Sequence, residues 1–293
     1  MMLPFFPREG LESMWTTLAL AAFLAGAPGQ AQSPGQTQAL KLTNIRATYG
    51  ILGAERKDTK ILPGDIYCIS FDIEGLKANE EDRASYRLTL QVTNKAGKVV
   101  YTFGPVDQEV YLSLGGSTTQ SSVILTTDLN QAAGEYTARV VVVDKMTKSK
   151  QEFTRKIEIL DKEFGIIRLR TTRDPEGNFP SPPIGVAGEF MSIHFFAAHF
   201  DRDTNRRQQP DLAAEMRILD EKNVPLASKP STGGVNDDVP LSSTAVQMRF
   251  TIALNRPGKF TIELQVTDKV SKKKVKKLLP LTVLDQKTSS DSN

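Results

Sequence analysis

Two stretches decide the fold: residues 129–150 read LNQAAGEYTARVVVVDKMTKSK, and residues 254–274 read LNRPGKFTIELQVTDKVSKKK. After one deletion they align at an offset of 124 residues, which carries Gly134 to Gly258 and Asp144 to Asp268. The same offset carries Gly64 to Gly188, Phe71 to Phe195, and the ending 159–161 to 283–285. A shared offset over separated segments predicts an internal duplication that divides the chain near Asp161.

Apolar side chains alternate with polar ones in both quoted stretches and in several others. In residues 260–267, Phe, Ile, Leu and Val alternate with Thr, Glu, Gln and Thr, and residues 67–74 and 86–93 show the same period. A period of two is typical of strands with one buried face. Each half offers seven or eight such runs separated by turn residues. We therefore expect an all-β fold of two tandem antiparallel β-sandwich domains.

The run G-x-[Tyr/Phe]-T, an alternating strand, Asp-Lys and a second strand resembles the last hairpin of bacterial extracellular Ig-like repeats, of the PKD and fibronectin type III kind. The resemblance covers about 30 residues in each half. It implies Ig-like sandwiches but no particular ligand. Phe260 stands where the first half has Tyr136, and both halves lack the cysteine pair and tryptophan of antibody-type domains.

The N-terminus differs from the rest of the chain. Residues 15–27 (WTTLALAAFLAGA) form an apolar run followed by small residues, which is typical of a secretory signal and short for a bilayer span. We expect a signal peptide over 1–31, with Met14 as an alternative start, and an exported protein in the periplasm or outside the cell. A flexible linker over 32–38, domains over 39–161 and 162–285, and a disordered tail over 286–293 complete the predicted organisation.

Candidate catalytic and metal-binding groups are few. His194 and His199 are separated by an odd number of residues, so on a strand they point to opposite faces. Asp201, Asp203 and Asn205 begin like a calcium loop, but Arg206 stands where that loop needs glycine. We predict no catalytic residue, no metal, no cofactor and no enzyme activity. A net charge of +3 does not indicate nucleic acid as a partner.

Lysine is concentrated near the C-terminus. Residues 268–277 hold one aspartate and six lysines: Lys269, Lys272, Lys273, Lys274, Lys276 and Lys277. The cluster fits an edge strand protected against pairing with other chains, or alternatively a patch for an anionic polymer or surface.

A second candidate surface lies on the strand around residue 195. Cys68, Ser70, Asp72 and Glu74 should face outward in the first half; their counterparts are Ser192, His194, Phe196 and Ala198. An outward phenylalanine between His194 and Ala198 suggests cover by a loop, by the other domain or by a partner protein. The same strand phase predicts that Cys68, the only cysteine, is partly accessible.

These features favour a non-catalytic structural or interaction module whose partner is another exported protein or a cell-envelope component. A periplasmic chaperone-like role and a carbohydrate-binding or anionic-surface-binding role are the alternatives.

Overall fold

Residues 39–286 are described by the computed structural model, and they form an all-β fold, as the alternating patterns predict. The expected signal peptide (1–31), the linker (32–38) and the tail beyond residue 286 lie outside the described residues. Within 39–286 there is one short 3-10 turn, Thr204–Arg206, and no α-helix. No helix of this region is long and apolar enough to cross a membrane.

We call residues 39–161 the N-terminal half and residues 162–285 the C-terminal half. Eight strands belong to the N-terminal half: β1 (Lys41–Thr48), β2 (Lys60–Ile61), β3 (Ile66–Glu74), β4 (Arg83–Asn94), β5 (Val99–Tyr111), β6 (Thr119–Thr126), β7 (Gly134–Asp144) and β8 (Lys150–Ile159).

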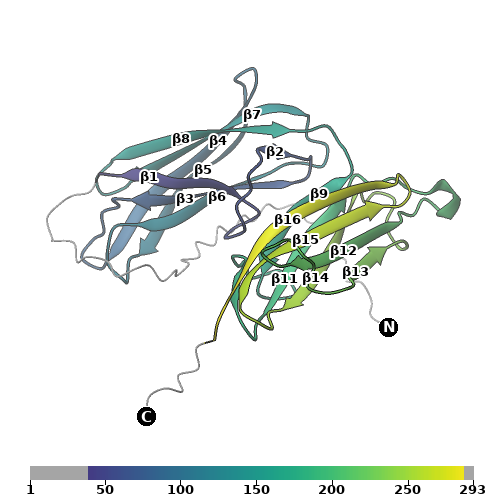
Figure 1. The fold of residues 1–293 in the computed structure, drawn as a ribbon. Coiled ribbons are helices and arrows are strands. Elements are labelled where there is room, and N and C mark those ends of the chain that lie inside the picture. Colours follow the sequence, from purple (N-terminus) through teal and green to yellow (C-terminus); the bar gives the residue numbers. More distant parts are fainter. Residues whose placement is uncertain (1–38, 287–293) are drawn as a thin grey trace, which may run out of the picture.

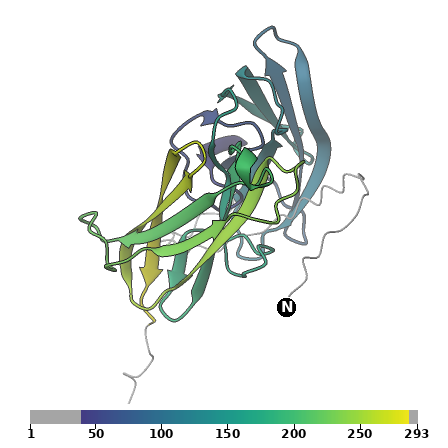
Figure 2. The same cartoon turned by 90° about the vertical axis from the view of Figure 1, so that its right-hand side faces the viewer.

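The C-terminal half also contains eight strands: β9 (Gly165–Thr172), β10 (Ile184–Val186), β11 (Phe190–Ala198), β12 (Leu212–Leu219), β13 (Ser231–Val235), β14 (Ala245–Ala253), β15 (Gly258–Asp268) and β16 (Lys273–Leu284). In Figures 1 and 2 the two sets of strands form separate groups that lie side by side.

The sheets of the two halves have the same strand order. The order β1-β3-β6 matches β9-β11-β14, and β2-β8-β7-β4-β5 matches β10-β16-β15-β12-β13. All pairings are antiparallel except β2 with β8 and β10 with β16, which are parallel. The repeat seen in the sequence therefore extends to the connectivity of every strand.

Each half has one hydrophobic core, which both of its sheets line. In the N-terminal half Phe71 of β3 and Leu88 of β4 are among the fully buried side chains. In the C-terminal half Phe195 of β11 and Leu264 of β15 occupy a similar core. Alternate residues of each strand point into these cores, which is why a period of two runs through the sequence.

Local geometry repeats at the 124-residue offset as well. Asn44 and Arg168 both have positive φ, at 50° and 52°, and both lie where β1 and β9 shift register against their neighbours. Such a β-bulge turns the strand and redirects one side chain. At Arg168 the redirected side chain points towards the N-terminal half.

The two halves touch through loops of the N-terminal half. Asp65 Oδ1 accepts a hydrogen bond from Arg168 N at 2.7 Å, and Gly64 O accepts one from Arg168 Nε at 2.8 Å. His199 Nε2 lies 2.9 Å from Pro63 O. Ala54 is buried in the core of the C-terminal half. We call this set of contacts the junction.

Candidate functional site

An open cleft of about 460 Å³ lies at one end of the C-terminal half. It forms where the β12–β13 hairpin separates. β13 pairs with β12 from Leu212 to Met216. Beyond that, residues 220–224 form a tight turn and Leu226 N donates back to Ile218 O, so residues 227–230 are extra residues between this turn and β13. Pro225 and Pro230 lie in this connection and have no N–H to offer a neighbouring strand. The segment between them forms one wall of the cleft.

The corresponding end of the N-terminal half has no such extra residues. There a short turn, residues 95–98, joins β4 to β5, and Val92 of β4 is 1% exposed. Tyr136 packs over this end, and its hydroxyl donates to Ala132 O at 2.9 Å and accepts from Gln131 Nε2 at 3.1 Å. Its counterpart Phe260 has no hydroxyl and follows a shorter loop, so this fastening is missing in the C-terminal half.

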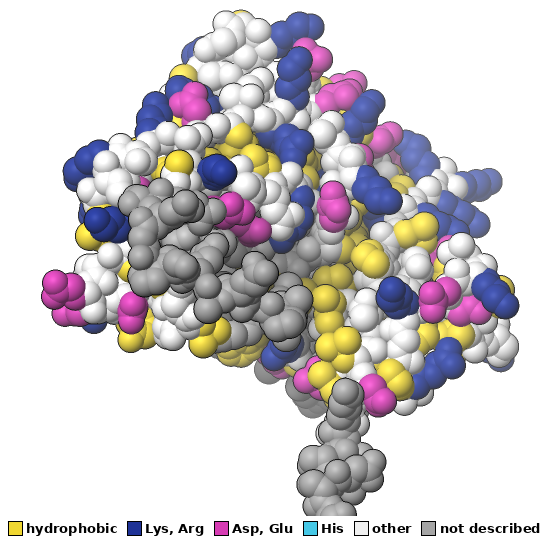
Figure 3. Space-filling model, turned by 60° about the vertical axis from the view of Figure 1, so that its left-hand side comes forward, with side chains coloured by type: hydrophobic (Ala, Val, Ile, Leu, Met, Phe, Trp, Pro, Cys, Tyr) yellow, Lys and Arg dark blue, Asp and Glu magenta, His cyan; other side chains and the backbone are white. Residues whose placement is uncertain are grey.

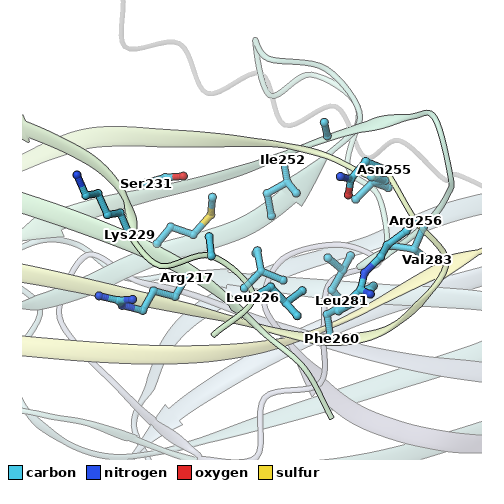
Figure 4. A pocket seen from close by; sticks show the side chains of 15 residues that line it. Arg217, Leu226, Lys229, Ser231, Ile252, Asn255, Arg256, Phe260, Leu281 and Val283 are labelled. Atoms are coloured by element: carbon cyan, nitrogen blue, oxygen red, sulfur yellow. The ribbon is translucent and has the colours of Figure 1, made fainter. Parts of the chain in front are cut away.

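The floor of the cleft is apolar and its rim is cationic. Ile252, Leu281 and Val283 form part of the floor, while Arg217, Lys229 and Arg256 stand around it. Figure 4 shows Arg217 and Lys229 at one end and Arg256 at the other, with apolar side chains between them. Among the described residues, no carboxylate lines the cleft.

The three rim cations have no anionic partner within residues 39–286. The ion pairs and side-chain hydrogen bonds of this region leave out Arg217, Lys229 and Arg256. Arg256 does lie over the ring of Phe260, 5.3 Å from its centroid. A cleft of this volume with an apolar floor and unpaired cations suits a ligand that is apolar with an anionic group.

The surface expected around Phe196 is largely covered. His194 is 1% exposed and Ala198 is fully buried, so neither is open to a partner protein, and cover from within the chain is the alternative that the structure shows for them. The loop that follows β9 folds over this face: a side chain at Gly177 would lie within 3.4 Å of the His194 ring. Phe196 is partly buried, with the guanidinium of Arg168 5.6 Å from its ring centroid. Phe196 therefore lies beside the junction.

His194 has no hydrogen-bond partner on either ring nitrogen within the described chain. Burial lowers the pKa of His194, and the nearby charge of Arg170 lowers it further. A neutral imidazole under a loop could act as a base, but none of its described contacts is with a serine or cysteine nucleophile.

The lysines of the hairpin between β15 and β16 divide into two sets. Lys269 pairs with Asp211 at 3.2 Å, Lys276 with Glu263 at 2.7 Å, and Lys277 approaches Asp58 of the N-terminal half at 3.9 Å. Lys272, Lys273 and Lys274 are exposed and have no ion pair within residues 39–286. Lys272 lies in the turn before β16, and Lys273 and Lys274 are its first residues, where only β15 pairs with it.

The calcium-like run has a structural role in this fold. Asp203 Oδ1 accepts from Asn205 N at 2.8 Å and so caps the 3-10 turn. Within residues 39–286 no three His, Cys, Asp or Glu side chains are grouped so that they could hold a metal ion.

The prediction that Cys68 is partly accessible is wrong, because the thiol is fully buried. The hydroxyl of Ser70 lies 3.9 Å from its sulfur, and that of Thr48 is close by. This outward face of β3 is packed in the structure, which alternation alone does not reveal.

Sequence reasoning missed the cleft. Arg217, Lys229 and Arg256 are far apart in the chain and form no motif. The sequence signal that could have indicated it is the pair Pro225 and Pro230, which lies between β12 and β13. The matching connection of the first half, between β4 and β5, contains no proline.

No family model and no curated protein matches this chain. The similarities to solved structures are weak. The Streptococcus agalactiae AgI/II polypeptide BspA C-terminal domain has a TM-score of 0.28 and 9% identity, over 83% of this chain and 100% of that one. The DNA-bound alkylpurine DNA glycosylase AlkC of Pseudomonas fluorescens has a TM-score of 0.29 and 11% identity, over 42% of this chain.

A family 123 glycoside hydrolase of Clostridium perfringens has a TM-score of 0.30 and 9% identity, over 43% of this chain. This chain covers 31% of the length of the DNA glycosylase chain and 28% of the length of the hydrolase chain. At these TM-scores the similarities carry no functional argument.

Proposed function

We propose that this protein is an exported, non-catalytic interaction module that holds a partner in the cleft of its C-terminal half. The observation that carries the proposal is the open apolar cleft with three unpaired cations, Arg217, Lys229 and Arg256, on its rim. Export rests on the apolar run 15–27, which is typical of a secretory signal.

The binding free energy favours a ligand that has both an apolar part and an anionic group. Apolar surface that enters the cleft contributes about 25 cal/mol per Å² removed from water. An anionic group beside the rim replaces water around cations that have no anionic partner among residues 39–286, and each such contact is worth up to about 1 kcal/mol at an exposed site. The partner is therefore apolar with at least one acidic group.

Anilinonaphthalene sulfonate (ANS), a fluorescent apolar anion, tests this on the full chain. We expect the triple variant Arg217→Gln, Lys229→Gln, Arg256→Gln to bind ANS several-fold more weakly than the parent, since wherever the single sulfonate lies along the rim it loses a charged contact worth up to about 1 kcal/mol. Fluorescence titration gives the dissociation constants.

The matched control is the triple variant Lys272→Gln, Lys273→Gln, Lys274→Gln, which removes the same charge away from the cleft. It should bind ANS as the parent does. Equal weakening in both variants would mean that only overall charge matters, and equal affinity in all three proteins would place the ANS elsewhere; either outcome rejects the cleft as the binding site.

A further inference from the structure

The outer edge of β13 borders the cleft and lacks the usual protection of an edge strand. β13 is the last strand of its five-stranded sheet, and its residues Ser231–Val235 (STGGV) carry no charge. Four of the five are exposed. Ser231 is at once the first residue of β13 and part of the cleft wall.

Two other exposed stretches of these sheets, β5 and the free part of β16, are guarded. β5, which matches β13 in the N-terminal half, shifts register twice against β4 and carries Asp107 and Glu109. The free part of β16 carries lysines. Bulges and charges of this kind prevent an edge from pairing with another chain. β13 has neither, so its open backbone is available to a further strand.

The register shows which backbone groups are free. Ile218 O accepts from Leu226 N, so the even-numbered residues of β12 point their backbone groups towards the β13 side. Their partners Ser231, Gly233 and Val235 therefore bond to β12. The N–H and C=O groups of Thr232 and Gly234 point away from the sheet, and no hydrogen bond within residues 39–286 uses them.

We propose that an extended acidic and apolar segment of a partner protein adds to the sheet along β13 and places an apolar side chain in the cleft. This deepens the proposed function and rests on it. In a strand added beside β13, every second side chain would lie on the core face of the sheet, the face on which the side chain of Ser231 lies. Where the added strand passes Ser231, these side chains lie at the mouth of the cleft, and its acidic residues can meet the cationic rim. Main-chain bonds give affinity, and the cleft gives specificity.

The test uses a fluorescein-labelled peptide of alternating isoleucine and aspartate, blocked at both ends, and the full chain. Fluorescence anisotropy should show saturable binding. The same peptide with N-methyl groups on alternate residues cannot form the edge hydrogen bonds and should bind about tenfold more weakly. A peptide with lysine in place of aspartate should also bind about tenfold more weakly, because it meets the cationic rim with like charge.

On the protein side the matched pair is Thr232→Pro and Thr232→Val. Proline removes the outward N–H of residue 232, whereas valine keeps it. We expect about tenfold weaker peptide binding for Thr232→Pro and a change within about twofold for Thr232→Val. Circular dichroism checks that both variants fold, and the N-methylated peptide carries the test if Thr232→Pro does not.

The outcomes separate the two proposals. If ANS binds the cleft but N-methylation leaves peptide affinity unchanged, strand addition is wrong and the cleft proposal stands. If neither ANS nor peptide depends on the rim cations, both fail. If sedimentation equilibrium shows a dimer of the protein alone that Thr232→Pro dissociates, the occupant of the edge is a second copy, and a partner segment is ruled out.

Discussion

At the scale of single residues, hydrogen bonds to a buried carboxylate explain the aspartate of the repeated Asp-Lys pair. Asp268 Oδ1 accepts from Val270 N at 3.0 Å, and its Oδ2 accepts from Asp201 N at 2.9 Å. Asp144 makes the equivalent bonds to Met146 N and Lys77 N. One carboxylate thus fastens the hairpin to the loop that follows β3 or β11. A buried carboxylate is kept only where such donors satisfy it, so the residue recurs in both halves.

Cys68 gives a prediction at the same scale. Burial raises the pKa of its thiol, and a buried neutral thiol is a poor nucleophile. We expect a thiol reagent such as Ellman's reagent to label Cys68 only in denaturant, and the labelling to follow unfolding measured by circular dichroism. Fast labelling of the native protein at neutral pH would contradict the packing described for this face of β3.

At the scale of elements, alternation predicted the strands well because each sheet has one face on a core. It predicted less about the other face. Cys68 and His194 have outward parity, yet neighbouring segments cover both. Which loop folds back over a sheet depends on contacts far apart in sequence, such as that of Gly177 with His194. The cleft was also not predictable from a sequence motif, because it forms where the β12–β13 hairpin opens.

The lysine hairpin is the element whose role the sequence left open. Figure 3 shows Lys and Arg scattered with Asp and Glu among them on the face in view. Lys272, Lys273 and Lys274 are exposed and have no ion pair among residues 39–286, so they are open to an anionic polymer. Changing all three to Gln should weaken binding to dextran sulfate and reduce its salt dependence, because fewer counterions are released.

The cleft variant Arg217→Gln, Lys229→Gln, Arg256→Gln is the control, since it has the same net charge. If both variants lose affinity for dextran sulfate equally, or if neither loses any, the three lysines do not form a specific anionic-polymer site. Their role would then be edge protection alone.

At the scale of the whole molecule, the junction is polar and partly buried. Arg56 lies in it, with Nη1 2.8 Å from Asp65 Oδ2 and Nε 3.0 Å from Asp58 Oδ1. Burial by itself would lower the pKa of Arg56, but the two carboxylates outweigh it and raise the pKa. Asp65 also accepts from Arg168 N, so one carboxylate joins the charge pair of the N-terminal half to the bulge of the C-terminal half.

Arg168 is the residue through which the halves can be uncoupled. Arg168→Ala removes the bond from Nε to Gly64 O and the contact with Phe196 but leaves both cores intact. A hydrogen bond from a charged group is worth about 1.5–3 kcal/mol, so coupling between the halves should fall by that amount. Calorimetry should then show two transitions in the variant. Arg173→Ala, at an exposed site of the same half, should behave as the parent.

This prediction follows from two cores that have no residue in common, although Ala54 of the N-terminal half lies in the core of the C-terminal half. If each half holds itself together, a fragment of residues 39–161 should give dispersed NMR signals and unfold cooperatively, at a lower temperature than in the full chain because the junction is lost. Trypsin should also cut Arg168→Ala faster at exposed Lys162, which lies between the cores. A fragment without dispersed signals, or one unchanged transition in Arg168→Ala, would show that the halves fold as a single unit and that the junction belongs to a common core.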